Sequence, residues 1–232
     1  MINKKLIKSI LKISSADIKY EYHLSSVYNK YSGYTMIPEN IYKTNLKISD
    51  KYLKDIKGDV VECGVWKGGM TAGIAEMLGN ERNYYLFDSF EGLPPVQEID
   101  GSAAKKWQNN KTSTNFFDNC RAEIVHADTV MQMTNCNYRL IKGWFNETLP
   151  KFDLAKEIAL LRLDADWYES TIICLRELYP KVVNRGIVII DDYFQWNGCS
   201  KAVHDYLSEI KSKSCIRTIN DVCFIIKTED EK

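Results

Sequence analysis

Five short apolar segments, most of them ending in or just before an acidic residue, recur between residues 58 and 192 and constrain the fold more than any other feature of the sequence. Helix-like patterns separate several of them, at 68–79 and from about Glu169 to Tyr179. Strands that alternate with helices form a doubly wound, mainly parallel sheet with right-handed crossovers. The strand-like segments are residues 58–64, 83–90, 138–144, 158–164 and 186–192.

The last part of the chain predicts a hairpin. Residues 214–227 read as two strands around Asn220-Asp221, a pair typical of tight hairpin turns. Before it, residues 200–212 carry apolar side chains at helical spacing, with Ser200 as a candidate N-cap. We therefore predict an α/β fold with a seven-stranded, mainly parallel sheet that ends in an antiparallel hairpin strand.

Composition places the chain among globular proteins. It has 232 residues, enough for one sizeable domain, and we expect residues 1–57 to be a helical extension packed on a domain formed by residues 58–232. Lysine and arginine number 31, as do aspartate and glutamate, so no basic excess indicates a nucleic acid or an anionic membrane as partner.

Cellular location is predicted from the cysteines and the N-terminus. The seven cysteines contain no CxxC pair, which favours reduced thiols in the cytoplasm over disulfides or a zinc site. The N-terminal stretch "MINKKLIKSILKISS" is interrupted by lysines and reads as an amphipathic helix, too short in its apolar run for a signal peptide or a membrane span.

The turn after the first predicted strand has the features of a nucleoside site. In "VECGVWKGGMT" (61–71), Gly64 begins a glycine-rich connection that lets the backbone approach a ligand closely. Asp88 ends the next strand, where doubly wound folds hold ribose hydroxyls. The G-x-G-x-x-G spacing for a pyrophosphate is absent, and Glu62 would repel one. S-adenosylmethionine is the commonest nucleoside ligand without a diphosphate.

The fourth and fifth predicted strands end in carboxylates that predict a metal site. Asp164 ends one, and Asp191 and Asp192 end the other. Parallel neighbours lie about 5 Å apart, so these side chains converge on one point. Unpaired like charges there would repel, and a cation that prefers oxygen ligands, such as Mg²⁺ or Ca²⁺, removes that repulsion.

Residues near these strand ends are weaker candidates. Asp166 either shares the face of Asp164 or caps the helix that begins near Glu169. His204, on the 200–212 helix, either packs or supports the acceptor or the metal. Tyr193 belongs to a group of aromatic residues beside the strand ends that could stack on a sugar or simply pack in the core.

Five ordered motifs are similar to those of the macrocin-type O-methyltransferases, with a shorter upstream match, "TMI", at 35–37. The resemblance covers roughly residues 34–210. The motifs are "GDVVECGVWKGGM", "LFDSFEGLP", "IKGWFNETLP", "LLRLDADWYEST" and "VIIDDY…AVHDY".

The resemblance implies a class I methyltransferase (Rossmann-like) fold and Mg²⁺-dependent methylation of a sugar hydroxyl, with S-adenosylmethionine as donor, in a homo-oligomer. It implies that a group of residues from four motifs surrounds the donor, and that the metal ligands are Asp164, Asp191 and Asp192. The implied donor residues are Thr35, Met36, Glu62, Gly64, Asp88, Ser89, Gly143 and Trp144.

The acceptor and the base are less constrained. Residues 1–33 and 96–137 differ from those of the macrolide enzymes, which favours a simpler sugar, free, nucleotide-linked or within a glycan or glycosylated natural product. We expect Asp164, or a water polarised by the metal, to take the proton of the hydroxyl. The alternatives are a catechol or other small diol as acceptor, a nicotinamide-dependent oxidoreductase, and a non-catalytic subunit.

Overall fold

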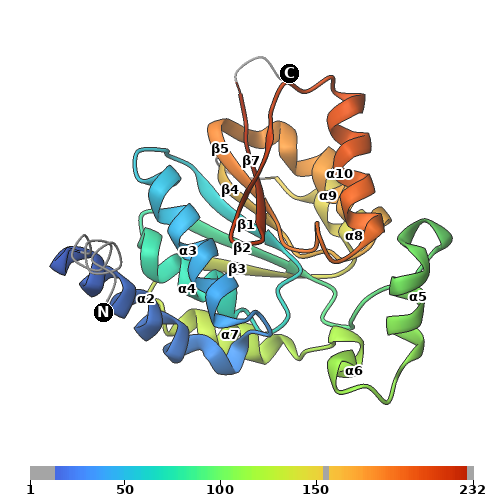
Figure 1. Cartoon of the computed structure of the whole chain (residues 1–232), viewed down its shortest axis with the longest axis horizontal. Coiled ribbons are helices and arrows are strands. Elements are labelled where there is room, and N and C mark those ends of the chain that lie inside the picture. The colour runs from blue at the N-terminus through green and yellow to red at the C-terminus, as the bar shows by residue number, and fades with distance from the viewer. Residues whose placement is uncertain (1–13, 154–156, 229–232) are drawn as a thin grey trace, which may run out of the picture.

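The structure, a computed structural model, describes residues 14–153 and 157–228, which are built around a seven-stranded sheet (Figure 1). The strand order is β3-β2-β1-β4-β5-β7-β6. Strands β1 to β5 pair in parallel, whereas β7 pairs antiparallel with both β5 and β6. The strands are β1 (Asp59–Cys63), β2 (Asn83–Asp88), β3 (Asn137–Lys142), β4 (Ile158–Leu163), β5 (Val182–Ile190), β6 (Ile216–Ile219) and β7 (Val222–Ile226).

This topology confirms the predicted fold, including the closing hairpin. Asn220 and Asp221 have φ angles of 44° and 65°, which a tight two-residue hairpin turn requires. The main difference is that β5 begins at Val182 and not at Gly186. Its early part is polar and contains Arg185 with φ 66°, where the register with β4 shifts. Such an irregular start is invisible to a search for apolar runs.

Helices cover both faces of the sheet, as Figure 1 shows. Helices α2, α3, α4 and α7 contribute to the core on one face, and α9 and α10 to the core on the other. The predicted N-cap Ser200 is wrong, because α10 begins three residues earlier, after Trp196. The helices are α2 (Ser15–Tyr31), α3 (Glu39–Leu53), α4 (Gly69–Leu78), α5 (Gly101–Asn109), α6 (Phe117–Cys120), α7 (Ile124–Gln132), α8 (Phe145–Thr148), α9 (Tyr168–Leu178) and α10 (Asn197–Glu209).

Alternation along the strands divides the core between these faces. Successive side chains of a strand point to opposite sides of the sheet. Val60 and Leu160 pack with the α3–α4 side, whereas Val61 and Leu161 pack with the α9–α10 side, and all four are buried. Because both faces are covered, the central strands β1 and β4 are buried at every position and are mostly apolar.

The N-terminal helices pack on the sheet domain. Helix α2 starts with a capping box, in which the Ser14 hydroxyl accepts from the Asp17 backbone N–H and the Asp17 carboxylate accepts from that of Ser14. Tyr31 and Tyr42 are fully buried in the same core as the sheet residues. The amphipathic helix predicted at the N-terminus lies almost wholly outside the described residues. Among the helices that are described, none is long and apolar enough to cross a membrane.

The polar interval between β2 and β3 contains α5, α6 and α7, and α5 and α6 extend away from the sheet (Figure 1). All four residues of α6 have positive φ angles, between 47° and 58°. A run of left-handed residues without glycine costs energy and persists only where its surroundings hold it. Asn119 does this by donating from its side-chain amide to the Leu93 carbonyl at 2.8 Å.

Gly73 of α4 tests the packing of the N-terminal helices. A Cβ at this position would lie 1.9 Å from the hydroxyl oxygen of the buried Tyr42. We expect Gly73→Ala to lower the free energy of unfolding by about 1–3 kcal/mol, although alanine favours helices. Gly33→Ala, which meets no atom within 4 Å, is the control. Equal urea-unfolding midpoints for the two variants would contradict this packing.

Candidate active site

The strand order reverses between β1 and β4, with β2 and β3 on one side of this point and β5 on the other. In doubly wound folds, ligands bind at such a switch point. The residues that follow these two strands touch. The backbone N–H of Asp164 donates to the Cys63 carbonyl at 2.8 Å. Gly64 has φ 86°, and a Cβ there would lie 1.6 Å from the Asp164 carbonyl oxygen. Position 64 therefore requires glycine.

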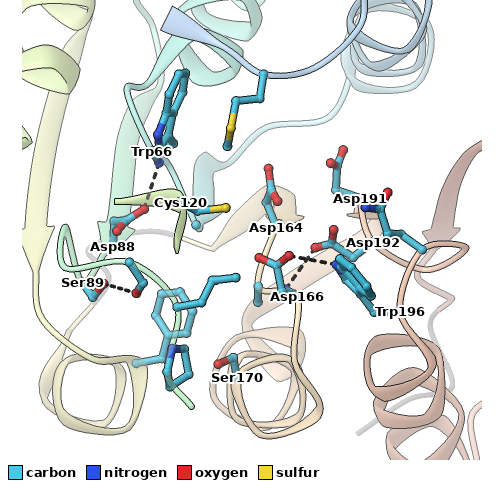
Figure 2. A pocket seen from close by; sticks show the side chains of 18 of the residues that line it. Trp66, Asp88, Ser89, Cys120, Asp164, Asp166, Ser170, Asp191, Asp192 and Trp196 are labelled. Carbon is cyan, nitrogen blue, oxygen red and sulfur yellow. Dashed lines mark hydrogen bonds between the residues drawn. The ribbon is translucent and has the colours of Figure 1, made fainter. Parts of the chain in front are cut away.

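A cavity of about 860 Å³ opens at this point. Figure 2 shows Trp66, Asp88 and Ser89 on one side of it and a group of aspartates on the other. Of the residues that the resemblance implied for the donor, six line the cavity, namely Met36, Gly64, Asp88, Ser89, Gly143 and Trp144.

Asp88 organises the side of the cavity that follows β2. One of its carboxylate oxygens accepts from the backbone N–H groups of Val65 at 2.7 Å and Trp66 at 2.9 Å, and the other accepts from Phe90 at 2.6 Å. Burial raises the pKa of Asp88, and these three hydrogen bonds oppose that rise. The carboxylate thus fixes the glycine turn while it lines the cavity.

Asp164, Asp166 and Asp192 form the opposite side and are called the acidic cluster below. A carboxylate oxygen from each lies within 4.8 Å of the others. Asp166 has φ 55°, so the chain turns before α9 and its side chain joins the cavity. The prediction that Asp166 caps this helix is wrong, since the N-cap residue is Trp167 and makes no side-chain cap. The indole N–H of Trp196 donates to Asp166 at 2.9 Å.

Arg162 holds Asp191 outside this cluster. It points from β4 into the fully buried layer, where its guanidinium pairs with Glu62 and Asp191, and with Asp164 at 2.9 Å. Asn45 of α3 accepts from the same side chain at 3.4 Å. Asp166 is therefore the third member of the acidic cluster, where the sequence predicted Asp191. Asp191 still lines the cavity.

The acidic cluster is crowded with negative charge. Burial is the main reason that the pKa values of Asp164 and Asp192 are raised well above the usual range, and neighbouring carboxylates raise them further. Burial likewise raises the pKa of Asp166 to about 7, against the lowering effect of the Trp196 hydrogen bond. A cation bound among these oxygens would favour the charged carboxylates and so lower their pKa values.

Four other candidate residues do not line the cavity. Glu62 is 1% exposed and bonds to Arg162 and to the Thr71 hydroxyl, so it fixes the strand ends and does not face a ligand. Thr35 accepts from the backbone N–H of Ile37 at 3.1 Å. Tyr193 and His204 bond to each other at 2.8 Å on the outer side of α10, where His204 is exposed.

The sequence did not predict the part of the wall that comes from residues 97–120. Trp107, Asn115, Phe117 and Cys120 line the cavity from this segment. The indole of Trp107 packs edge-on against that of Trp196 at 5.9 Å between ring centroids. The one available signal was an aromatic residue recurring in an otherwise polar stretch, a pattern too short to assign a position in space.

Comparison with known proteins identifies the family. Residues 17–227 match the model of the family described as macrocin O-methyltransferase (TylF). The chain belongs to the macrocin O-methyltransferase family. This confirms the resemblance read from the sequence and the assignment to the methyltransferases.

The chain is also similar to individual proteins that are named as O-methyltransferases. The chain is 32% identical over 177 residues to the demethyldecarbamoylnovobiocin O-methyltransferase of Streptomyces niveus, covering 75% of this chain and 67% of that protein. It is 34% identical over 158 residues to the 8-demethyl-8-(2,3-dimethoxy-alpha-L-rhamnosyl)-tetracenomycin-C 4'-O-methyltransferase of Streptomyces olivaceus, covering 65% and 58%. The solved structure of the O-methyltransferase NovP is similar at a TM-score of 0.71 and 29% identity, covering 84% of this chain and 83% of that one.

Removal of the buried guanidinium of Arg162 tests the central ion-pair network. Arg162→Met leaves Glu62, Asp164 and Asp191 without their partner, and we expect a loss of about 3–5 kcal/mol in the free energy of unfolding, or failure to fold. Arg176→Met, which breaks the exposed pair with Glu209, should cost less than about 1 kcal/mol. Chemical denaturation of both variants measures the difference, and similar losses would contradict it.

The crowding of the acidic cluster predicts how stability depends on pH. The folded pKa of Asp166 lies above its ordinary value, so the folded state binds this proton more tightly than the unfolded chain. Stability is then lost as pH rises from about 4 to about 7. In the presence of a chelator, the wild type should lose more melting temperature between pH 5 and pH 8 than Asp166→Asn. The opposite order would be evidence against a raised pKa.

Proposed function

We propose that this protein is a Mg²⁺-dependent O-methyltransferase that transfers the methyl group of S-adenosylmethionine to a sugar hydroxyl. The observation that carries the proposal is one cavity with two unlike ends, the glycine turn with Asp88 and the acidic cluster, adjoining at the contact of Gly64 with Asp164. Methyl transfer in line requires a donor and an acceptor oxygen held side by side.

The residues at the first end fit S-adenosylmethionine. The Asp88 oxygen that accepts only from the Phe90 backbone N–H keeps a lone pair for a ribose hydroxyl, whereas the other oxygen already accepts from Val65 and Trp66. The indole N–H of Trp66 is buried and has no partner among the described residues, so it is available to an acceptor atom of a ligand. Gly143, with φ 142°, and Trp144 supply the wall implied for the adenine.

The residues at the second end fit a divalent cation. The acidic cluster offers oxygen ligands only, the chemistry that Mg²⁺ favours. Asp164 and Asp192 belong both to the ligand set predicted from the strand ends and to the cluster found in the structure. Asp166 and Asp191 are the two candidates for a third ligand, and Arg162 competes for Asp191.

When both groups are bound, the donor supplies the methyl group and the cation supplies positive charge beside the acceptor oxygen. The chain has to orient the hydroxyl and accept its proton. Asp166 suits the second task better than Asp164, because Asp164 already pairs with Arg162, whereas Asp166 accepts only from the Trp196 indole among the described side chains. Trp196 holds that carboxylate toward the cavity.

The sugar acceptor is supported by the relatives and by the wall. The tetracenomycin enzyme is named for a rhamnosyl substrate. Trp196 and Phe194 line the cavity beside the acidic cluster, and aromatic faces suit the apolar face of a sugar ring. A cytoplasmic location and a homo-oligomeric state stay predictions from the sequence and its family.

A panel of sugars tests the function. The protein is incubated with S-adenosylmethionine, Mg²⁺ and free sugars, aryl glycosides, nucleotide sugars or catechols, and products are searched by mass spectrometry for the mass of one added methyl group. We expect transfer to a sugar, its loss with a chelator, and its return with Mg²⁺. Transfer to catechols alone would refute the sugar acceptor, and chelator-resistant transfer would refute the metal.

Variants separate the roles within the acidic cluster. Asp166→Asn should lower kcat by about 10²–10⁴ while donor binding persists. Asp164→Asn and Asp192→Asn should weaken Mg²⁺ binding measured by calorimetry. Asp205→Asn, an exposed acid of α10 paired with Lys201, is the control and should leave both properties unchanged. Unaltered kcat in Asp166→Asn would exclude this residue as the base.

A further inference from the structure

Three tryptophan side chains pack against one another beside the acidic cluster. Trp107 belongs to α5, Trp167 is the N-cap residue of α9, and Trp196 is the N-cap residue of α10. The ring centroids are 6.0 Å apart for Trp107 and Trp167, 5.9 Å for Trp107 and Trp196, and 5.3 Å for Trp167 and Trp196, and each pair meets edge-on. Because every ring contacts the other two, no ring can turn without disturbing its neighbours. These residues are called the tryptophan triangle below.

The three indole N–H groups connect the tryptophan triangle to two different places. Those of Trp107 and Trp167 donate to main-chain carbonyls in residues 89–123, which lie between β2 and α7, contain α5 and α6, and are called the β2–α7 segment below. That of Trp196 donates to the Asp166 carboxylate at 2.9 Å, the hydrogen bond drawn in Figure 2. The tryptophan triangle thus joins the β2–α7 segment to the acidic cluster. The accepting carbonyls of the segment belong to Asn115 and Pro94, each at 3.0 Å.

The base of α5 is fastened to the same two helices, α9 and α10. The carboxylate of Asp100, which is 2% exposed, accepts from the backbone N–H of Tyr168, the first residue of α9, at 2.8 Å. Its other oxygen accepts from the backbone N–H of Gln97 at 2.8 Å. On α10, a Cβ at Gly198 would collide with the Asp100 carboxylate, so these two elements approach each other closely. The rest of the tryptophan triangle belongs to α9 and α10, and this buried anchor therefore fixes α5 relative to it.

Asp166 depends on Trp196 for its orientation. The backbone N–H of Asp166 donates to the Asp192 carboxylate at 3.0 Å, which fixes its main chain. Its own carboxylate accepts only from the Trp196 indole among the described side chains. Trp196 is 7% exposed and can shift only if the rings around it shift. The tryptophan triangle thus sets the direction of this carboxylate, and one of its rings, that of Trp107, belongs to the β2–α7 segment.

We propose that Trp107 is a positioning residue for methyl transfer: it supports the ring of Trp196, which directs the Asp166 carboxylate toward the acceptor hydroxyl. This inference rests on the proposed function and deepens it, because it makes the placement of the β2–α7 segment a condition for proton removal by Asp166. Trp107 also lines the cavity, but a role by direct contact with the acceptor has a different kinetic signature. Support of Trp196 acts on kcat, whereas contact with the acceptor acts on KM.

A double-mutant cycle tests whether Trp107 acts through Asp166. With S-adenosylmethionine, Mg²⁺ and the best acceptor of the sugar panel, Trp107→Leu should lower kcat about tenfold and leave KM within about twofold, because the base is misplaced while the acceptor still binds. In the Asp166→Asn background the same substitution should lower kcat by less than about twofold, since the carboxylate that it would misplace is gone. A rise in KM at unchanged kcat, or an equal tenfold loss in both backgrounds, would overturn the proposal.

A conservative variant tests the need for a ring at position 107. Trp107→Phe keeps an edge-on aromatic contact with Trp196 and should retain about half of kcat or more. A loss of kcat as large as that of Trp107→Leu would contradict support by an aromatic contact. Trp107→Met, which also lacks a ring, replaces Trp107→Leu if that variant does not fold.

Hydrogen exchange of the indoles tests the same link without an acceptor. In the full chain labelled with ¹⁵N-tryptophan, Trp196→Phe identifies the indole signal of Trp196 by its loss. We expect the Trp196 indole proton to exchange with solvent about fivefold faster in Trp107→Leu than in the wild type, because one supporting ring contact is lost. Phe117→Ala, which removes an exposed, cavity-lining ring of the same segment, should leave the exchange rate unchanged.

The exchange experiment also keeps this inference apart from the proposed function. Unchanged exchange in Trp107→Leu, or equal acceleration in Phe117→Ala, would show that Trp107 does not support Trp196. Transfer of methyl groups to no sugar at all would instead refute the proposed function, and the exchange rates would still decide whether Trp107 fixes the Trp196 indole on Asp166.

Discussion

The buried guanidinium of Arg162 is the interaction on which the rest of the structure depends. A charge so far from water is tolerated only with close partners of opposite sign. Here the partners come from different elements: Glu62 from β1, Asp191 from the end of β5, Asp164 from the end of β4, and Asn45 from α3. One side chain therefore aligns three parallel strands and ties an N-terminal helix to them at the edge where the cavity opens.

The same network explains why the two ends of the cavity lie so close together. Glu62 and Arg162 sit side by side in the register of β1 and β4. One residue beyond the end of each strand, Gly64 and Asp164 meet through their backbones, since no side chain separates them. The glycine turn and the acidic cluster thus adjoin through main-chain atoms, which move less than side chains. The sheet itself therefore sets the separation between the two ends of the cavity.

The fold was predictable from the sequence because burial on two faces makes β1, β4 and the second half of β5 mostly apolar, and the glycine turn and strand-end acids mark where each stops. Which of the acids form the acidic cluster was less predictable. Asp191 and Asp192 are neighbours in sequence and look equivalent, yet Arg162 takes one and leaves the other to the acidic cluster. That choice depends on a contact across strands, and Asp166 joins the cluster only because its φ is 55°. Neither the pairing of Asp191 with Arg162 nor the backbone angle of Asp166 can be read from a local sequence pattern.

The part of the wall that comes from residues 97–120 was not predicted for a similar reason. Its left-handed turn at α6 is held by long-range hydrogen bonds such as that of Asn119 with Leu93.

Charge links the acidic cluster to the buried ion pairs behind it, because Asp164 belongs to the cluster and also pairs with Arg162. Carboxylates gathered at a switch point are costly to keep near one another, as the raised pKa values of Asp164 and Asp192 indicate, and a cation relieves that cost. Beside the acids, the described wall carries the exposed apolar side chains of Met36, Phe117 and Phe194. The same cavity therefore presents carboxylates and apolar side chains, a combination that suits a ligand with a polar and an apolar part.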